Sequence, residues 1–139
     1  MTLAFYLLDT DTASFIIKAR SPSIEAKLTE IPADRLCISA VTRAELMYGL
    51  KRLPAGHRLH AGVRQFFNIM RVLAWDSDAA DRYADIRHQL TTSGQPIGDP
   101  DMMIAAHALS IGAVLVTNNT RHFARITAPE PLVLENWFQ

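Results

Sequence analysis

Residues 3–9 read Leu3-Ala4-Phe5-Tyr6-Leu7-Leu8-Asp9, an apolar run of strand length that ends abruptly at a carboxylate. Apolar side chains at consecutive positions need cover on both faces, as in a central strand of a parallel sheet. Residues 36–39 and 113–117 have the same character, and 72–74 and 132–134 suit a further short strand and an edge strand. These runs predict the strands of one buried sheet.

Longer helical patterns alternate with the apolar runs. The expected helices cover residues 11–18, 23–31, 40–52, 57–70, 77–92 and 99–112. Asp99-Pro100 marks the start of the last helix, because aspartate suits an N-cap and proline suits the first helical position. Strands that alternate with helices predict an α/β fold with a mainly parallel sheet covered on both faces. With no repeat or composition break, residues 1–139 are expected to form a single domain.

The composition fits a globular protein and carries no overall charge that would attract nucleic acid. Of the residues, 49% are apolar and 20% are charged, and the 14 basic side chains balance the 14 acidic ones. Global charge therefore gives no support to nucleic-acid binding, and any RNA contact must come from local basic patches. The alternative is that these patches are ordinary solvated helix faces. The two candidate patches are His57, Arg58, His60, Arg64 and Arg71, and Arg43, Lys51 and Arg52.

Compartment signals in the sequence point to the cytoplasm. The only cysteine, Cys37, cannot form a disulfide within the chain and is expected to be buried and inert. No apolar segment is long enough to cross a bilayer, and the N-terminus has neither the basic start nor the cleavage site of a signal peptide. We therefore expect a cytoplasmic protein with no membrane contact.

Polar side chains gather where the apolar runs end. Asp9 ends the first run, Glu45 lies on the helix after the second, Asp101 opens a helix and Asn119 follows residues 113–117. Each has a structural alternative: a helix cap for Asp9, a capping box with Thr42 for Glu45, a favourable helix dipole for Asp101 and a turn for Asn119. In parallel sheets, however, ligands bind beyond the carboxyl ends of the strands, which would collect these side chains at one edge.

Three carboxylates at one edge predict a site for a hard cation. They repel one another unless a cation intervenes, and oxygen ligands without cysteine favour Mg²⁺, with Mn²⁺ as a substitute. Such ions support hydrolysis of phosphodiesters or phosphomonoesters. Ser39 and Thr117 have no histidine base near them in sequence, so a nucleophilic triad has no support.

One resemblance is to phosphatases of the haloacid dehalogenase type. The segment Asp9-Thr10-Asp11-Thr12 after an apolar strand is similar to their opening motif, which would make Asp9 a covalent nucleophile and Asp11 a general acid. Those phosphatases hold the phosphate with a lysine between their second and last motifs. Here no lysine follows Lys51, and the chain is short for that family. This interpretation remains the alternative.

A stronger resemblance, over nearly the whole chain, is to the PIN-domain nucleases, and among them to the VapC toxins of toxin–antitoxin pairs. Its motifs occur in order in residues 6–11 (YLLDTD), 38–49 (ISAVTRAELMYG), 96–106 (PIGDPDMMIAA) and 116–123 (VTNNTRHF). Two departures are Asn119, where many PIN domains have aspartate, and His122, where relatives often have an acidic residue. These departures make a second metal less secure than the first.

The resemblance implies a three-layer α/β/α sandwich and a metal-dependent endoribonuclease. Asp9 and Asp101 would be the principal metal ligands, with Glu45 holding water or acting as the base, and the products would carry a 3′-hydroxyl and a 5′-phosphate. Asn119, Thr117 and Asp99 would give support. The implied substrate is structured RNA, often the anticodon stem-loop of a tRNA, and the toxins that look most similar cut initiator tRNA. The implied partners are a VapB-type antitoxin and a second copy of the chain.

A binding module that keeps the fold but has lost activity is a third functional class, and the intact carboxylates Asp9, Glu45 and Asp101 disfavour it.

Overall fold

A five-stranded sheet in the order β3-β2-β1-β4-β5 forms the centre of the computed structural model, which describes residues 4–138. Its strands are β1 (Tyr6–Leu8), β2 (Leu36–Ser39), β3 (Arg71–Leu73), β4 (Val114–Val116) and β5 (Val133–Glu135). Every neighbouring pair is parallel. The predicted parallel sheet is confirmed, and the carboxyl ends of the strands therefore share one edge.

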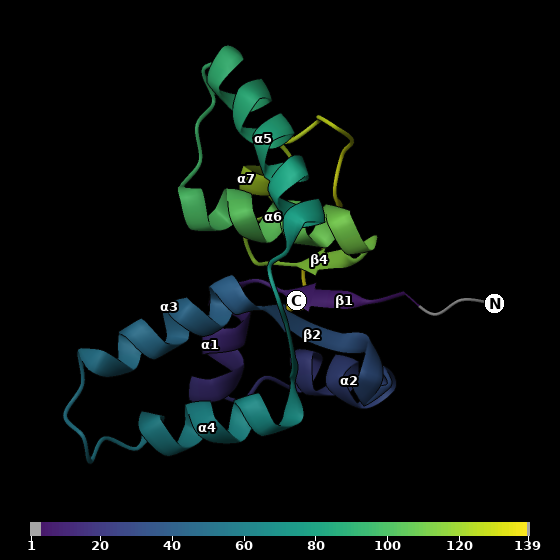
Figure 1. Cartoon of the computed structure of the whole chain (residues 1–139). Helices are drawn as coiled ribbons and strands as arrows, with labels where there is room; N and C mark the ends of the chain where they lie inside the picture. The colour runs from purple at the N-terminus through teal and green to yellow at the C-terminus, as the bar shows by residue number, and fades with distance from the viewer. Residues whose placement is uncertain (1–3, 139) are drawn as a thin grey trace.

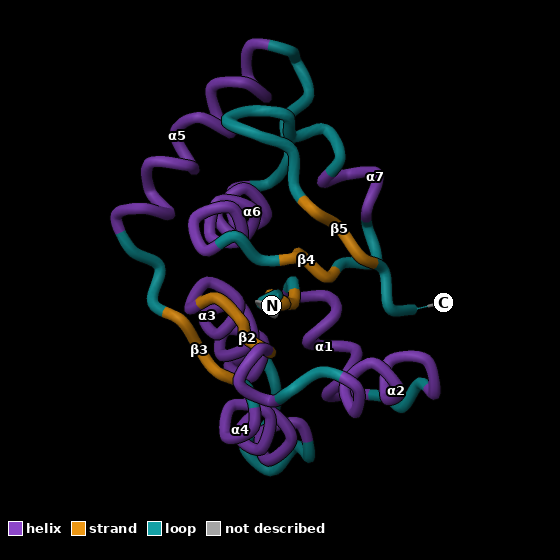
Figure 2. The backbone as a smooth tube through the Cα atoms, turned by 90° about the vertical axis from the view of Figure 1, so that its right-hand side faces the viewer, coloured by secondary structure: helices purple, strands orange, loops and turns teal. Residues whose placement is uncertain are grey.

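Helices cover both faces of this sheet, so the predicted three-layer α/β/α architecture is confirmed (Figures 1 and 2). α5 and α6 lie on one side, and α1, α2 and α4 lie on the other. The helices are α1 (Thr10–Lys18), α2 (Pro22–Glu30), α3 (Ala40–Lys51), α4 (Leu59–Ile69), α5 (Ser77–Thr92), α6 (Asp99–Ile111) and α7 (Thr120–Phe123). A short 3-10 turn, Ala33–Arg35, precedes β2.

Two apolar cores flank the sheet because successive side chains of a strand point to opposite faces. Leu7 and Leu115 are fully buried in the core beneath α5 and α6. Their neighbours Leu8 and Val116 are fully buried in the core that α1, α2 and α4 cover. Burying one such side chain contributes roughly 1.5–3 kcal/mol, which explains why unbroken apolar runs build this sheet.

Several predicted boundaries differ from the observed ones. β1 begins at Tyr6, and Leu3, which the predicted strand includes, lies outside the described residues. Asp99 is the first residue of α6 and not its cap, because Gly98 occupies the cap position. Ser39, not Thr42, caps α3 by accepting a hydrogen bond from the backbone N–H of Val41, so the predicted capping box is wrong.

The order of the strands creates a switch point at β1. The chain builds β2 and β3 on one side of β1 and then crosses to build β4 and β5 on the other. In open parallel sheets, a crevice for ligands forms outside the carboxyl ends of the strands at such a point. Within residues 4–138, no helix has the length and apolar character needed to cross a membrane.

Candidate active site

Asp9 occupies the switch point, directly after β1. It caps α1: its Oδ1 accepts a hydrogen bond of 2.8 Å from the backbone N–H of Thr12. Only 4% of Asp9 is exposed. Burial raises the pKa of Asp9 above its ordinary value, while hydrogen bonds from Thr117 and Thr12 act in the opposite direction. A carboxylate that is short of solvation at a strand end is stabilised by a bound cation. Asp9 thus has both roles considered from the sequence, a cap and a potential ligand.

Glu45, on α3, is fixed by a residue that the sequence reasoning missed. The hydroxyl of Thr10 lies 2.5 Å from Glu45 Oε1 and 3.1 Å from the hydroxyl of Thr42. Thr10 is the first residue of α1, so this contact ties α1 to α3 over 35 residues of sequence. The only sequence signal for Thr10 is its position directly after Asp9. The Thr10 hydroxyl orients the carboxylate of Glu45, which is expected to hold water or act as the base.

Asp101 lies in the first turn of α6 and contacts a histidine on α7, the short helix that follows β4. Its Oδ2 is 3.1 Å from Nε2 of His122, on α7. The side chain of Asp101 is 42% exposed and that of His122 is 20% exposed. Asp101 is therefore open to solvent on one side and held by an imidazole on the other.

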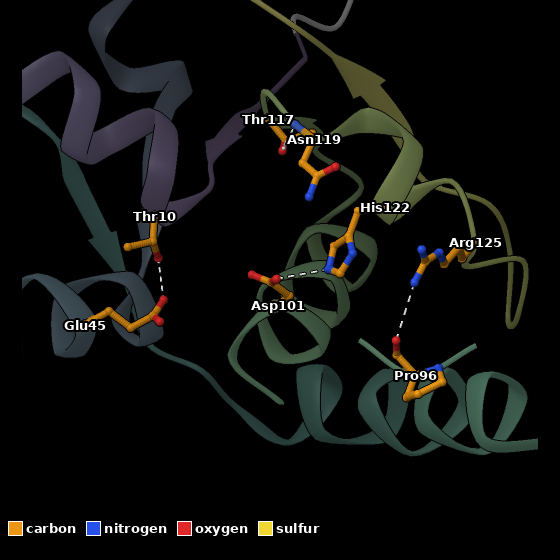
Figure 3. Close-up of polar contacts among 8 residues, drawn as sticks. All are labelled: Thr10, Glu45, Pro96, Asp101, Thr117, Asn119, His122 and Arg125. Carbon is orange, nitrogen blue, oxygen red and sulfur yellow. Dashed lines mark hydrogen bonds and ion pairs between the residues drawn. The ribbon is translucent and has the colours of Figure 1, made fainter. Parts of the chain in front are cut away.

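Two of the three predicted carboxylates, those of Glu45 and Asp101, face one space but do not form a closed set of ligands. In Figure 3, the carboxylates of Glu45 and Asp101 face the same space from opposite sides, with Asn119 beside it. Among the side chains of residues 4–138, no group of three or more His, Cys, Asp or Glu lies close enough to hold an ion as placed. Glu45 is hydrogen-bonded to Thr10 on one side of this space, and Asp101 contacts His122 on the other. Carboxylate and amide oxygens nevertheless suit a hard divalent cation, so the donor chemistry fits.

The three supporting residues have different surroundings. Thr117 is fully buried against Asp9, and its Oγ1 accepts a hydrogen bond of 2.9 Å from the backbone N–H of Asn119. Asn119 is exposed and precedes α7. Asp99 is bound to the neighbouring helix instead, because its Oδ1 accepts a hydrogen bond of 3.0 Å from the hydroxyl of Tyr83 on α5.

A buried serine–histidine pair, which the sequence does not indicate, lies between α3 and α6. Nδ1 of His107, on α6, lies 2.8 Å from Oγ of Ser39. The sequence gives no sign of this contact because 68 residues separate the two in the chain. Both side chains are buried, and Ser39 caps α3. Burial also lowers the pKa of His107. This pair joins the start of α3 to α6, and substrate cannot reach it.

Two grooves flank α3. One of about 400 Å³ opens beside Thr10 and Glu45. Its apolar lining residues come from α1, α3, α4 and the connection between α3 and α4, and are Ile17, Leu46, Leu50, Leu53, Leu59 and Val63; Asp11, Lys18 and Arg52 also line it. The other, of about 310 Å³, is basic and is lined by Arg43, Met47, Leu50, Lys51, His60, Arg64 and Phe67. The guanidinium of Arg43 lies 4.4 Å from the centre of the Phe67 ring. The basic groove combines residues from both patches predicted from the sequence.

Comparison with known proteins agrees with this arrangement. The PIN domain family model matches residues 6–129. The chain is 39% identical to the tRNA(fMet)-specific endonuclease VapC of Salmonella typhimurium, over 95% of this chain and 97% of that protein. It is 36% identical to the ribonuclease VapC2 of Haemophilus influenzae, with the same coverage of both chains.

The fold has the same relatives. A chain in the crystal structure of DNA-bound VapBC from Salmonella typhimurium superposes with a TM-score of 0.88 at 39% identity, covering 97% of this chain and 99% of that one. These matches favour a nuclease over the phosphatase alternative. The chain belongs to the PIN domain family and, within it, to the VapC ribonucleases.

Proposed function

We propose that this chain is the toxin of a toxin–antitoxin pair, an Mg²⁺-dependent endoribonuclease that cuts tRNA. The observation that carries the proposal is that the carboxylates of Glu45 and Asp101 face one space (Figure 3), where Glu45 is held by Thr10, the neighbour in sequence of the buried Asp9. Family membership supports an RNA-cleaving role for this acidic site, and the name of the Salmonella relative supports initiator tRNA as the substrate.

In this proposal, the ion is held mainly by Asp9 and Asp101. Asp9 is fixed by the backbone of Thr12 and by Thr117, which keeps one carboxylate orientation. Bound Mg²⁺, or Mn²⁺ in its place, supplies Lewis-acid stabilisation of the charge that develops on the scissile phosphate. Glu45, oriented by the Thr10 hydroxyl, accepts a proton from the attacking water. Asn119 and Thr117 support the site from the connection after β4, and Asp99 acts at most indirectly, through Tyr83.

The basic groove provides the contact that global charge does not. Arg43 and Glu45 are two positions apart on α3 and face different sides of this helix, so in this proposal an RNA strand passes over α3 from the basic groove to the carboxylates. Arg43, Lys51 and Arg64 attract the RNA backbone, and single-stranded loops admit a phosphate to a shallow site more readily than a paired duplex does. Basic and acidic surfaces then cancel in the net charge of zero.

A VapB-type antitoxin and a second copy of the chain are the proposed partners, supported by the VapBC complexes among the structural relatives. The apolar groove beside Thr10 and Glu45 offers a surface for an apolar antitoxin segment. A basic antitoxin side chain at the carboxylates would inhibit by taking the place of the metal.

The decisive experiment uses the full chain, purified free of antitoxin, with initiator and elongator tRNAs. We expect discrete cleavage of initiator tRNA with Mg²⁺ that EDTA abolishes, and 3′-hydroxyl and 5′-phosphate ends. Asp9→Asn and Asp101→Asn should each abolish cleavage, while Asp85→Asn, an exposed change on α5, should not. Cleavage that continues in Asp9→Asn would refute the proposed site. An acyl-phosphate on Asp9 with a small phosphomonoester would instead support the phosphatase alternative.

A further inference from the structure

His122 differs from the predicted metal ligands of the candidate site, because its side chain offers a nitrogen atom and theirs offer oxygen. It belongs to α7, the short helix after β4, and its ring lies edge-on to Phe123 with centroids 5.3 Å apart. Phe123 is 99% buried, so this packing restrains the ring. Figure 3 shows the imidazole directed at Asp101 and at the space that Glu45 faces from the other side.

The separation of the two side chains suits a shared ion. Nε2 of His122 and Oδ2 of Asp101 are 3.1 Å apart. Two ligands at adjacent corners of an octahedral ion, each roughly 2.1 Å from it, are about 3 Å from one another. An ion can therefore be bound by both atoms with little movement of either. Without metal, Nε2–H of His122 donates to the carboxylate of Asp101; an ion that binds at Nε2 takes the place of this proton, and the neutral imidazole then keeps its proton on Nδ1.

A nitrogen ligand changes which metals a site prefers. Mg²⁺ favours oxygen ligands and keeps much of its water, whereas imidazole suits transition metals. Asp9, Glu45 and Asp101 alone offer only oxygen, and His122 adds one nitrogen at the partly exposed edge of the site.

We propose that His122 is a metal ligand beside Asp101 and gives this site a preference for Mn²⁺ over Mg²⁺. The inference rests on the proposed function, since it assumes a divalent ion at Asp101. It goes further by assigning a role to His122 and by ranking the two ions.

The test uses the full chain, free of antitoxin, with each metal salt alone at pH 7.5. Titration calorimetry gives the affinities for Mn²⁺ and Mg²⁺, and electron spin echo modulation of bound Mn²⁺ detects a directly bound imidazole nitrogen. The variants are His122→Gln, which keeps a polar side chain, and Asp101→Asn. His88→Gln is the matched control, because His88 is exposed on α5, in another part of the fold.

We expect a nitrogen signal in the wild type and in His88→Gln, and its loss in His122→Gln. His122→Gln should weaken Mn²⁺ binding about tenfold and change Mg²⁺ binding less than about twofold, since loss of one group at a metal site costs roughly 10–100-fold in affinity. Mn²⁺ that binds through Asp101 without a nitrogen signal would overturn this inference alone, leaving His122 to position Asp101. Absence of any metal binding that depends on Asp101 would overturn the proposed metal site as well.

Discussion

The Thr10 hydroxyl lies 2.5 Å from Oε1 of Glu45 and so joins the residue after Asp9 to the helix that carries the second carboxylate. Thr10 also lies 3.1 Å from the hydroxyl of Thr42, which is fully buried. Glu45 is only partly buried and would otherwise be free to turn towards solvent. The site therefore depends on a hydroxyl that itself need not touch the metal.

Thr10→Val should lower kcat for RNA cleavage about tenfold, because a hydrogen bond to a charged group contributes roughly 1.5–3 kcal/mol. KM should change little, since Thr10 does not line the basic groove. Single-turnover kinetics with the proposed tRNA provide the measurement. Thr10→Ser keeps the hydroxyl and should retain most activity; equal rates for the valine variant and the wild type would remove Thr10 from the positioning role.

Asp9→Asn should stabilise the metal-free protein although it abolishes activity. The carboxylate is buried at a cost that the neutral amide avoids, while the amide oxygen can still accept the Thr12 hydrogen bond. We expect a gain on the order of 1 kcal/mol in the free energy of unfolding in EDTA at pH 7.5. Added Mn²⁺ should raise the Tm of the wild type and have a smaller effect on the variant. A Tm in EDTA below that of the wild type would contradict the expectation.

His107→Gln should flatten the loss of stability below pH 6.5. Burial lowers the pKa of His107 in the folded state, so at pH values between that pKa and 6.5 the unfolded state binds more protons. Stability from this group is therefore complete above about pH 6.5 and declines as the pH falls through the window below it. Urea unfolding from pH 8 to pH 5 measures the slope. His88→Gln, at an exposed histidine, should leave the slope as in the wild type.

Gly49→Ala should raise the free energy of unfolding by about 0.5–1 kcal/mol. Gly49 lies within α3, and no atom stands within 4 Å of the position its Cβ would take. Alanine is the better helix former because it loses less backbone entropy. Gly112→Ala is the contrasting variant: Gly112 ends α6 with φ 66°, a left-handed conformation that disfavours a side chain. It should destabilise the fold by about 1 kcal/mol, and thermal unfolding of the pair distinguishes the two.

Arg64→Gln should weaken RNA binding to a similar extent for all sequences and reduce the slope of log K against log salt by about 1. Arg64 lines the basic groove with Lys51 and Arg43. Fluorescence anisotropy of the Asp101→Asn protein with labelled tRNA, at several salt concentrations, measures this without cleavage. Arg82→Gln, on α5, should leave the slope unchanged. An unchanged slope in Arg64→Gln would mean that RNA does not contact this groove.

The sequence predicted the sheet and most of the helices because their signals are local. An unbroken apolar run has few alternatives to a buried parallel strand, so β2 was predicted at its observed bounds and α5 was predicted at residues 77–92. Boundaries shifted where competing caps were present. Ser39 displaced Thr42 as the cap of α3, and Thr42 instead contacts Thr10.

Contacts within the site were harder to predict because they depend on tertiary packing. The pairs Thr10–Glu45 and Ser39–His107 are separated by 35 and 68 residues, and no periodicity relates them. In the sequence, His122 stands out only as a departure from the family pattern. Its contact with Asp101 arises because α6 and α7 meet at the same edge of the sheet, a relationship that the strand order determines.

The central position of β1 also has a consequence for how the protein is made. β1 pairs with β2 on one side and with β4 on the other, and Trp137 packs against Tyr6 of β1 with ring centroids 5.7 Å apart. Synthesis runs from the N-terminus, so Asp9 exists long before the residues that complete its surroundings. A chain still on the ribosome lacks β4 and with it the assembled site. If the proposed function holds, the nuclease can cleave initiator tRNA only after β4 has been made, when translation of its own chain no longer requires that tRNA.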